Sequence, residues 1–137
     1  VTINPEPVIS TTLDANRCSD ATVGLVLNTN GVSVGALNYD IISRTAAGAL
    51  TPVNQVGVPA NGVAANYLQG EIYRNTTTGS LTVQYEVRAT GTIGGCVGDA
   101  QIITITIDPE PIVLDASNAV CSDNIVNLTL STDAGSV

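Results

Sequence analysis

The sequence contains no histidine and no lysine. Without histidine no Ser–His or Cys–His nucleophile pair can form, and without lysine there is no Schiff base and no P-loop lysine. Carboxylates remain as acids or bases, and the best candidate pair is Glu71 with Glu86. A glycosidase-like pair must face a shared cleft, whereas carboxylates on an exposed strand face are usually only solvated. The sequence therefore predicts a protein that is not an enzyme and has no catalytic residues.

Positive charge is also scarce, because four arginines stand against twelve acidic residues, with a formal net charge of −8. So few cations cannot neutralise a row of phosphates, which excludes nucleic acid as a partner. No apolar run approaches the roughly 20 residues of a membrane span, so none is predicted in this segment. The chain has neither an initiator methionine nor a signal peptide, and we expect both ends to be cuts in a longer polypeptide.

Aromatic residues are limited to four tyrosines, so the core must be built mainly from Val, Ile, Leu and Ala. Residues 81–90 and 103–107 alternate apolar and polar side chains, which predicts two half-buried strands. Further strands are predicted over residues 8–13, 22–28, 37–43 and 67–73, separated by turn-rich segments. No segment has a helical period. The pattern predicts an all-β, immunoglobulin-like antiparallel β-sandwich, in which the Tyr85 hydroxyl bonds back to the chain.

Two blocks of the sequence occur twice in the same order. Pro5-Glu6-Pro7 recurs as Pro109-Glu110-Pro111, 104 positions later, and Cys18-Ser19-Asp20 recurs as Cys121-Ser122-Asp123, 103 positions later. Apolar residues also follow each cysteine at the same offsets: Val23, Leu25 and Leu27 match Val126, Leu128 and Leu130. The sequence thus predicts a tandem array. Residues 1–4 would end one repeat, 5–108 would form a complete repeat, and 109–137 would supply the linker and first two strands of the next.

The three cysteines become an even number when they are counted per repeat. Cys18 precedes the second predicted strand, Cys96 lies in the loop before the last strand, and Cys121 is the next repeat's counterpart of Cys18. This placement favours a Cys18–Cys96 disulfide and an oxidising, extracellular location, with free thiols in a cytosolic protein as the alternative. Cys121 is an inter-repeat disulfide candidate, because its partner would lie outside this segment.

At residues 5–111 the sequence resembles the PKD-like (polycystic kidney disease-like) immunoglobulin repeat of large bacterial surface and gliding-associated adhesins. The resemblance rests on "CSD…VGLVL", "YLQGEIYRNTTTGSLTVQYEVRA", "GGCVGD" and "IITITIDPEP". It implies a spacer or adhesive β-sandwich in a long secreted protein, with Cys18 paired to Cys96. The sequence departs from the family pattern at Tyr39, where many such repeats carry a tryptophan.

Acidic residues near the predicted repeat junctions suggest calcium as a candidate ion, and no other cofactor is predicted. Carboxylates in flexible loops suit Ca²⁺. The candidates are Asp20, Asp99, Asp108, Glu110 and Asp123. Ordinary caps and turns at strand ends are the favoured explanation for them.

Two segments match the N-x-[ST] glycosylation pattern. They begin at Asn75 and Asn127, and the hydroxyl cluster Thr76, Thr77 and Thr78 adjoins the first. A turn is the favoured interpretation of residues 74–80.

Two functions remain open from the sequence. The first is a structural repeat of an extracellular adhesin or filament, with neighbouring copies of itself as head-to-tail partners and glycans or cell-surface ligands as candidate targets. The second is a carbohydrate-binding module of a secreted enzyme. Sugar binding on a sandwich usually needs exposed aromatic rings, so the first function is favoured.

Overall fold

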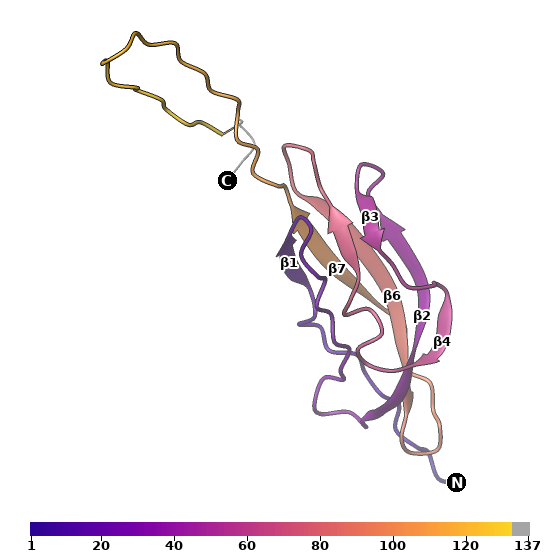
Figure 1. The fold of residues 1–137 in the computed structure, drawn as a ribbon. Coiled ribbons are helices and arrows are strands. Elements are labelled where there is room, and N and C mark those ends of the chain that lie inside the picture. The colour runs from indigo at the N-terminus through magenta and orange to yellow at the C-terminus, as the bar shows by residue number, and fades with distance from the viewer. Residues whose placement is uncertain (133–137) are drawn as a thin grey trace.

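The computed structural model describes residues 1–132 and has no helix in that range. Its strands form two facing layers of an elongated sandwich, and the N-terminus lies at the end opposite to the one where the last strand finishes (Figure 1). The strands are β1 (Ala15–Cys18), β2 (Ala36–Ala46), β3 (Thr51–Asn54), β4 (Ala60–Val63), β5 (Ile72–Arg74), β6 (Leu81–Gly91) and β7 (Gln101–Asp108).

The larger sheet has the order β1-β7-β6-β2-β4, and β3 pairs with β5 in the second layer. Residues 22–29 extend that layer without forming a regular strand, because Val23, Gly24 and Leu27 donate their backbone N–H groups to carbonyls of residues 65–71. The predicted all-β sandwich is confirmed. The larger sheet is mixed rather than wholly antiparallel, since β1 runs parallel to β7.

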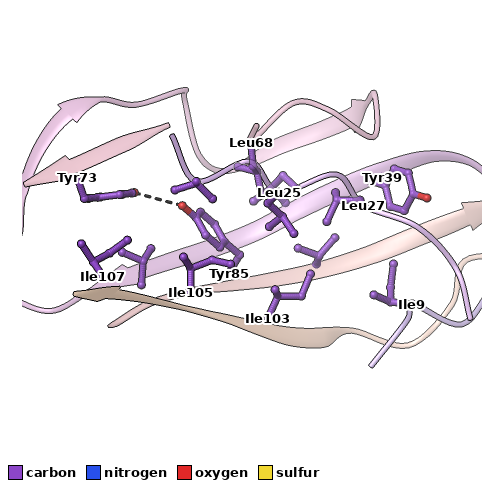
Figure 2. Close-up of a cluster of buried hydrophobic side chains, with 14 of the residues drawn as sticks. Ile9, Leu25, Leu27, Tyr39, Leu68, Tyr73, Tyr85, Ile103, Ile105 and Ile107 are labelled. Atoms are coloured by element: carbon purple, nitrogen blue, oxygen red, sulfur yellow. Dashed lines mark hydrogen bonds between the residues drawn. The ribbon is translucent and has the colours of Figure 1, made fainter. Parts of the chain in front are cut away.

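The core lies between the two layers and is built from the inward faces of β6 and β7. The predicted alternation in both strands is confirmed, and the register places Tyr85 opposite Ile103. Figure 2 shows these side chains meeting those of the second layer. The buried apolar residues are Ile9, Val23, Leu25, Leu27, Tyr39, Ile41, Leu50, Leu68, Tyr73, Val83, Tyr85, Val87, Ala89, Ile103, Ile105 and Ile107. Each large aliphatic side chain buried in this way contributes roughly 1.5–3 kcal/mol.

A β-bulge at Ile42 changes which side chains of β2 point inward. Ile41 lies opposite Val87, but Ser43 already lies opposite Glu86, so one residue of β2 is unpaired between them. The bulge shifts the alternation by one position. Arg44 therefore shares the inner face with its partner Tyr85.

Several weaker strand predictions are wrong. Residues 64–71 form successive turns, in which Tyr67, Gln69 and Glu71 each donate a backbone N–H to the carbonyl three residues earlier. These turn hydrogen bonds take the place of the interstrand bonds that a strand over residues 67–73 would need. Only the last two residues of that predicted strand belong to β5. The predicted strand over residues 8–13 is reduced to a single bridge at Ile9, and β3 and β4 fall in segments predicted as turns.

Candidate functional site at the ends of the sandwich

One end of the sandwich is formed where β7 stops and the segment Asp108–Pro111 begins. Cys18 is the register partner of Asp108, and Ser19 donates its backbone N–H to the Asp108 carbonyl at 3.0 Å. The Ser80 hydroxyl donates to the Asp108 carboxylate at 2.7 Å. A cavity of about 540 Å³ adjoins them, lined by Cys18, Ser19, Ser80, Asp108, Pro109, Glu110 and Pro111. This end of the sandwich therefore carries a cavity beside an exposed thiol.

The opposite end is closed by a glycine-rich loop that packs against residues 4–7. A Cβ atom on Gly98 would lie 2.0 Å from the Pro7 carbonyl oxygen, and one on Gly94 would lie 2.2 Å from the Asn4 amide nitrogen. Gly94 also has a φ of +67°, which favours glycine. The glycines beside Cys96 thus allow the loop to approach the N-terminal segment, a role that sequence reasoning missed.

Because the loop and residues 4–7 are so close, a methyl group added at Gly98 should destabilise the fold. Gly98→Ala should lower the free energy of unfolding by about 1–3 kcal/mol and release residues 4–7, because the added atom meets backbone that cannot rotate away. Urea denaturation and hydrogen exchange of residues 4–7 would measure both effects. Gly79→Ala is the matched control, since no atom lies within 4 Å of its added Cβ. Equal effects of the two substitutions would contradict this account.

The predicted Cys18–Cys96 bridge does not form within one repeat. All three cysteines are free thiols within residues 1–132. Cys18 pairs with Asp108, which lies near the first residue of β6, Leu81. Cys96 lies at the other end of β6, where its carbonyl accepts a hydrogen bond from the backbone N–H of Gly91. Eleven residues of extended strand separate the two ends, a distance of about 35 Å. Since disulfides join Cα atoms about 5.5 Å apart, the predicted pairing within one repeat is wrong.

The backbone of residues 113–132 reproduces that of the first repeat at several positions. Val113 bridges Thr132 as Ile9 bridges Thr29. The turn after each cysteine closes in the same way, with a bond from Ala21 to Cys18 at 3.1 Å and from Asn124 to Cys121 at 3.2 Å. In both turns the aspartate has a positive φ: 62° at Asp20 and 70° at Asp123. The repeated sequence thus adopts a repeated local conformation.

The two copies of this segment differ sharply in burial. In the first repeat the apolar residues after the cysteine are core residues, with exposed fractions of 0%, 4% and 2% for Val23, Leu25 and Leu27. Their counterparts have exposed fractions of 60%, 49% and 70% at Val126, Leu128 and Leu130. Residues 112–132 extend away from the sandwich as an open loop (Figure 1). Within residues 1–132 these three side chains thus remain about half exposed or more.

The calcium candidates are not assembled into one group. Asp20 forms an ion pair with Arg74 at 3.0 Å, and Asp108 accepts from Ser80 at the same end of the sandwich. Asp99 follows the glycine-rich loop at the opposite end, and Asp123 belongs to the next repeat. Among residues 1–132 no cluster of three or more acidic, cysteine or histidine side chains could hold a metal ion. The candidates do not form one metal site within residues 1–132, and calcium at the junctions stays a prediction.

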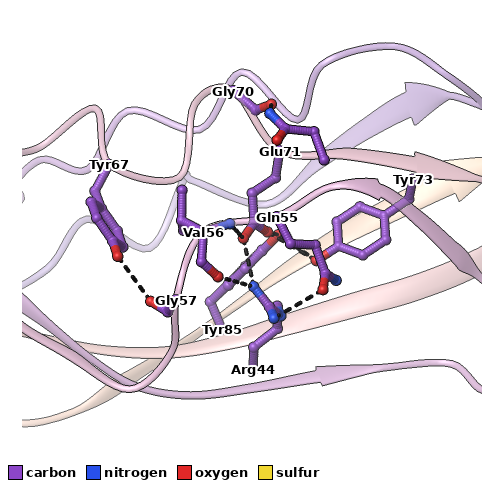
Figure 3. A network of polar contacts seen from close by, with 10 residues as sticks. Arg44, Gln55, Val56, Gly57, Tyr67, Gly70, Glu71, Tyr73 and Tyr85 are labelled. Carbon is purple, nitrogen blue, oxygen red and sulfur yellow. Dashed lines mark hydrogen bonds and ion pairs between the residues drawn. The ribbon is translucent and has the colours of Figure 1, made fainter.

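A buried polar cluster lies between the layers, centred on Glu71, whose side chain is fully buried (Figure 3). Its carboxylate accepts hydrogen bonds from Arg44 at 2.6 Å, from Tyr73 at 2.9 Å and from Tyr85. The backbone N–H of Val56 is a fourth donor at 3.1 Å. Burial is the main cause that raises the pKa of the Tyr73 and Tyr85 hydroxyls above the ordinary tyrosine value. Both phenols therefore remain donors, and the cluster joins β2, β5 and β6.

This cluster corrects two predictions. Glu71 points into the sandwich, whereas Glu86 lies on the outer face of β6, where it accepts a bond from Ser43. The two carboxylates do not face a common cleft, and Glu71 is buried rather than solvated on an exposed strand face as expected. The Tyr85 hydroxyl donates to a side-chain carboxylate rather than to the backbone.

The predicted sugar acceptor Asn75 is buried, and its amide is fully engaged. Its Nδ2 donates to the carbonyls of Gly79 and Ile107 at 2.9 and 2.8 Å, and its Oδ1 accepts from the backbone and hydroxyl of Thr77. An amide nitrogen held in this way is not accessible to a glycosyl group, so this prediction is wrong. Thr76 and Thr78 are exposed in the same turn, and Asn127 is exposed in the segment 112–132. They stay predictions.

Comparison of the chain with protein-family models, curated proteins and solved structures finds no match. Among residues 1–132 no helix is long and apolar enough to cross a membrane. The two ends of the sandwich and the exposed segment 112–132 are the features of the structure that bear on function.

Proposed function

We propose that the chain is a structural repeat of an extracellular tandem array, an adhesin or a filament, built from head-to-tail immunoglobulin-like modules of the PKD-like type. Residues 5–108 form the module, and residues 109–132 begin the next one. One observation carries the proposal: a segment repeats the local backbone of a core-forming segment, yet its apolar face is exposed.

The first repeat indicates what would cover that face. Val23, Leu25 and Leu27 are buried against the β2-β6-β7 sheet and the turns of residues 64–71. Val126, Leu128 and Leu130 would be buried by the corresponding parts of a second module. Because the module has its N-terminal segment and its linker at opposite ends, successive modules follow one another along a line. Such a contact does not close on itself and produces an open fibre.

The carbohydrate-binding alternative has less support. Three of the four tyrosines, Tyr39, Tyr73 and Tyr85, are buried. The fourth, Tyr67, is half-buried, and its hydroxyl donates to the Gly57 carbonyl at 2.9 Å. None of them, within residues 1–132, presents a freely exposed ring on which a sugar could stack.

Electron microscopy of the native assembly tests the proposal. The eleven residues of β6 span about 35 Å, so we expect linear particles with an axial period of at least that length. Compact single particles, in which residues 112–130 are folded back on residues 5–108 of their own chain, would contradict it.

A further inference from the structure

Cys18 and Cys96 lie far apart within one repeat, but they come to the same junction when two repeats are placed in series. Asn4 precedes the Pro-Glu-Pro segment of the first repeat as Asp108 precedes that of the next, so the two residues are counterparts. Asn4 belongs to the glycine-rich end of the sandwich, and Asp108 belongs to the end that carries Cys18. In an array these two environments coincide at every junction.

Both cysteines lie beside that shared residue. The Cys96 sulfur lies 3.9 Å from the Asn4 carbonyl oxygen. The corresponding oxygen, on Asp108, accepts the N–H of Ser19, the residue after Cys18, at 3.0 Å. Cys18 is also the register partner of Asp108 in a ladder whose strands lie about 4.8 Å apart. The Cys96 thiol and the backbone of Cys18 therefore lie beside the same linker residue in adjoining modules, where a short movement of the side chains would bring the two thiols within the span of a disulfide.

The cavity beside Cys18 offers space for the second thiol. In the first repeat, the loop of residues 94–98 packs so closely on residues 4–7 that side chains at Gly94 and Gly98 would collide with them. The counterparts of residues 4–7 are residues 108–111, which line the 540 Å³ cavity together with Cys18. The glycine-rich loop of the next module, packed in the same way, occupies this cavity and brings its cysteine to Cys18.

We propose that Cys18 forms a disulfide with the Cys96 counterpart of the following repeat, so that each junction is covalently closed across its linker. The inference rests on the proposed tandem array. By the same rule Cys96 pairs with the preceding repeat, and Cys121 pairs one junction further along. In the reaction, both S–H bonds are lost and one S–S bond forms. The two electrons and two protons pass to the disulfide of a thiol oxidant, which leaves as two thiols, in a compartment outside the reducing cytosol.

The peptide bond between Asp108 and Pro109 makes the bridge testable, because Asp–Pro bonds hydrolyse in mild acid, where disulfides do not exchange. The native assembly would be alkylated, cleaved in acid and separated without reductant. We expect the pieces that carry Cys18 and the next module's Cys96 counterpart to remain joined, and to separate only after reduction. Mass spectrometry of the joined product would identify both cysteines. Pieces that separate without reductant, with alkylated thiols or with a bridge inside one module, would overturn the proposal.

Two variants of the assembled protein provide the matched controls. Cys18→Ser should abolish the joined product at this junction, whereas Cys121→Ser should leave it unchanged, since Cys121 serves the following junction. Both cysteines are exposed, so neither substitution disturbs the core. Linear particles whose thiols are free would overturn the bridge and leave the array intact. Particles of a single module would overturn the array, and the bridge with it.

Discussion

Replacing Glu71 by alanine should lower the free energy of unfolding by about 3–5 kcal/mol, a large part of the stability of a domain this size. The substitution leaves the Arg44 guanidinium without its ion-pair partner in a largely buried position. It also removes the acceptor of the Tyr73 and Tyr85 hydroxyls. Urea denaturation followed by circular dichroism would measure the loss.

Glu86→Ala is the matched control, because it removes the same side chain from the outer face of the sheet. Glu86 accepts one hydrogen bond, from Ser43 at 3.0 Å, and we expect its loss to cost less than about 1 kcal/mol. A similar cost for both variants would show that the cluster around Glu71 does not hold the two layers together.

The second large effect concerns assembly rather than folding. Leu128→Asp should weaken the association of modules at least about 100-fold, because its counterpart Leu25 is a core residue and an unpaired carboxylate in such a layer costs several kcal/mol. Residues 5–108 should remain folded, since Leu128 is exposed in this structure. Sedimentation velocity and electron microscopy would measure the loss of long particles.

Thr129→Asp adds the same charge to the neighbouring position. Its counterpart in the first repeat, Val26, is exposed, so this variant should assemble normally. If both variants assemble, or if Leu128→Asp unfolds residues 5–108, the proposed burial of the second repeat is wrong.

The sequence predicted the strands whose side chains alternate between core and solvent, as β6 and β7 show. It did not predict β3, because all four of its residues are exposed and no alternation exists to detect. It also assigned residues 67–73 to a strand, although residues 64–71 form turns, since local turns leave no periodic signal. These elements are fixed by long-range pairing, which a local pattern does not contain.

The repeated sequence blocks predicted the boundaries of the repeats, but not how the cysteines are distributed between the two ends of the sandwich. A disulfide predicted from the sequence depends on the number of cysteines in one repeat. The sequence does not show at which end of a strand each cysteine lies. The register of β1 with β7 decides this, because it places Cys18 beside Asp108 while the glycine-rich loop holds Cys96 at the other end. The glycines beside Cys96, the only other cysteine in residues 5–108, were the sequence feature that could have indicated its close approach to residues 4–7.

The parallel pairing of β1 with β7 has a mechanical consequence. Tension along an array would pull residue 5 and residue 109 in opposite directions, and so would draw β1 and β7 past each other along their length. From Ala15 opposite Ile105 to Cys18 opposite Asp108, the paired residues form one continuous ladder. Its hydrogen bonds lie across the direction of pull and are loaded together, so they must rupture at once rather than one after another. The module is thereby suited to carry load along the axis on which its copies would be joined.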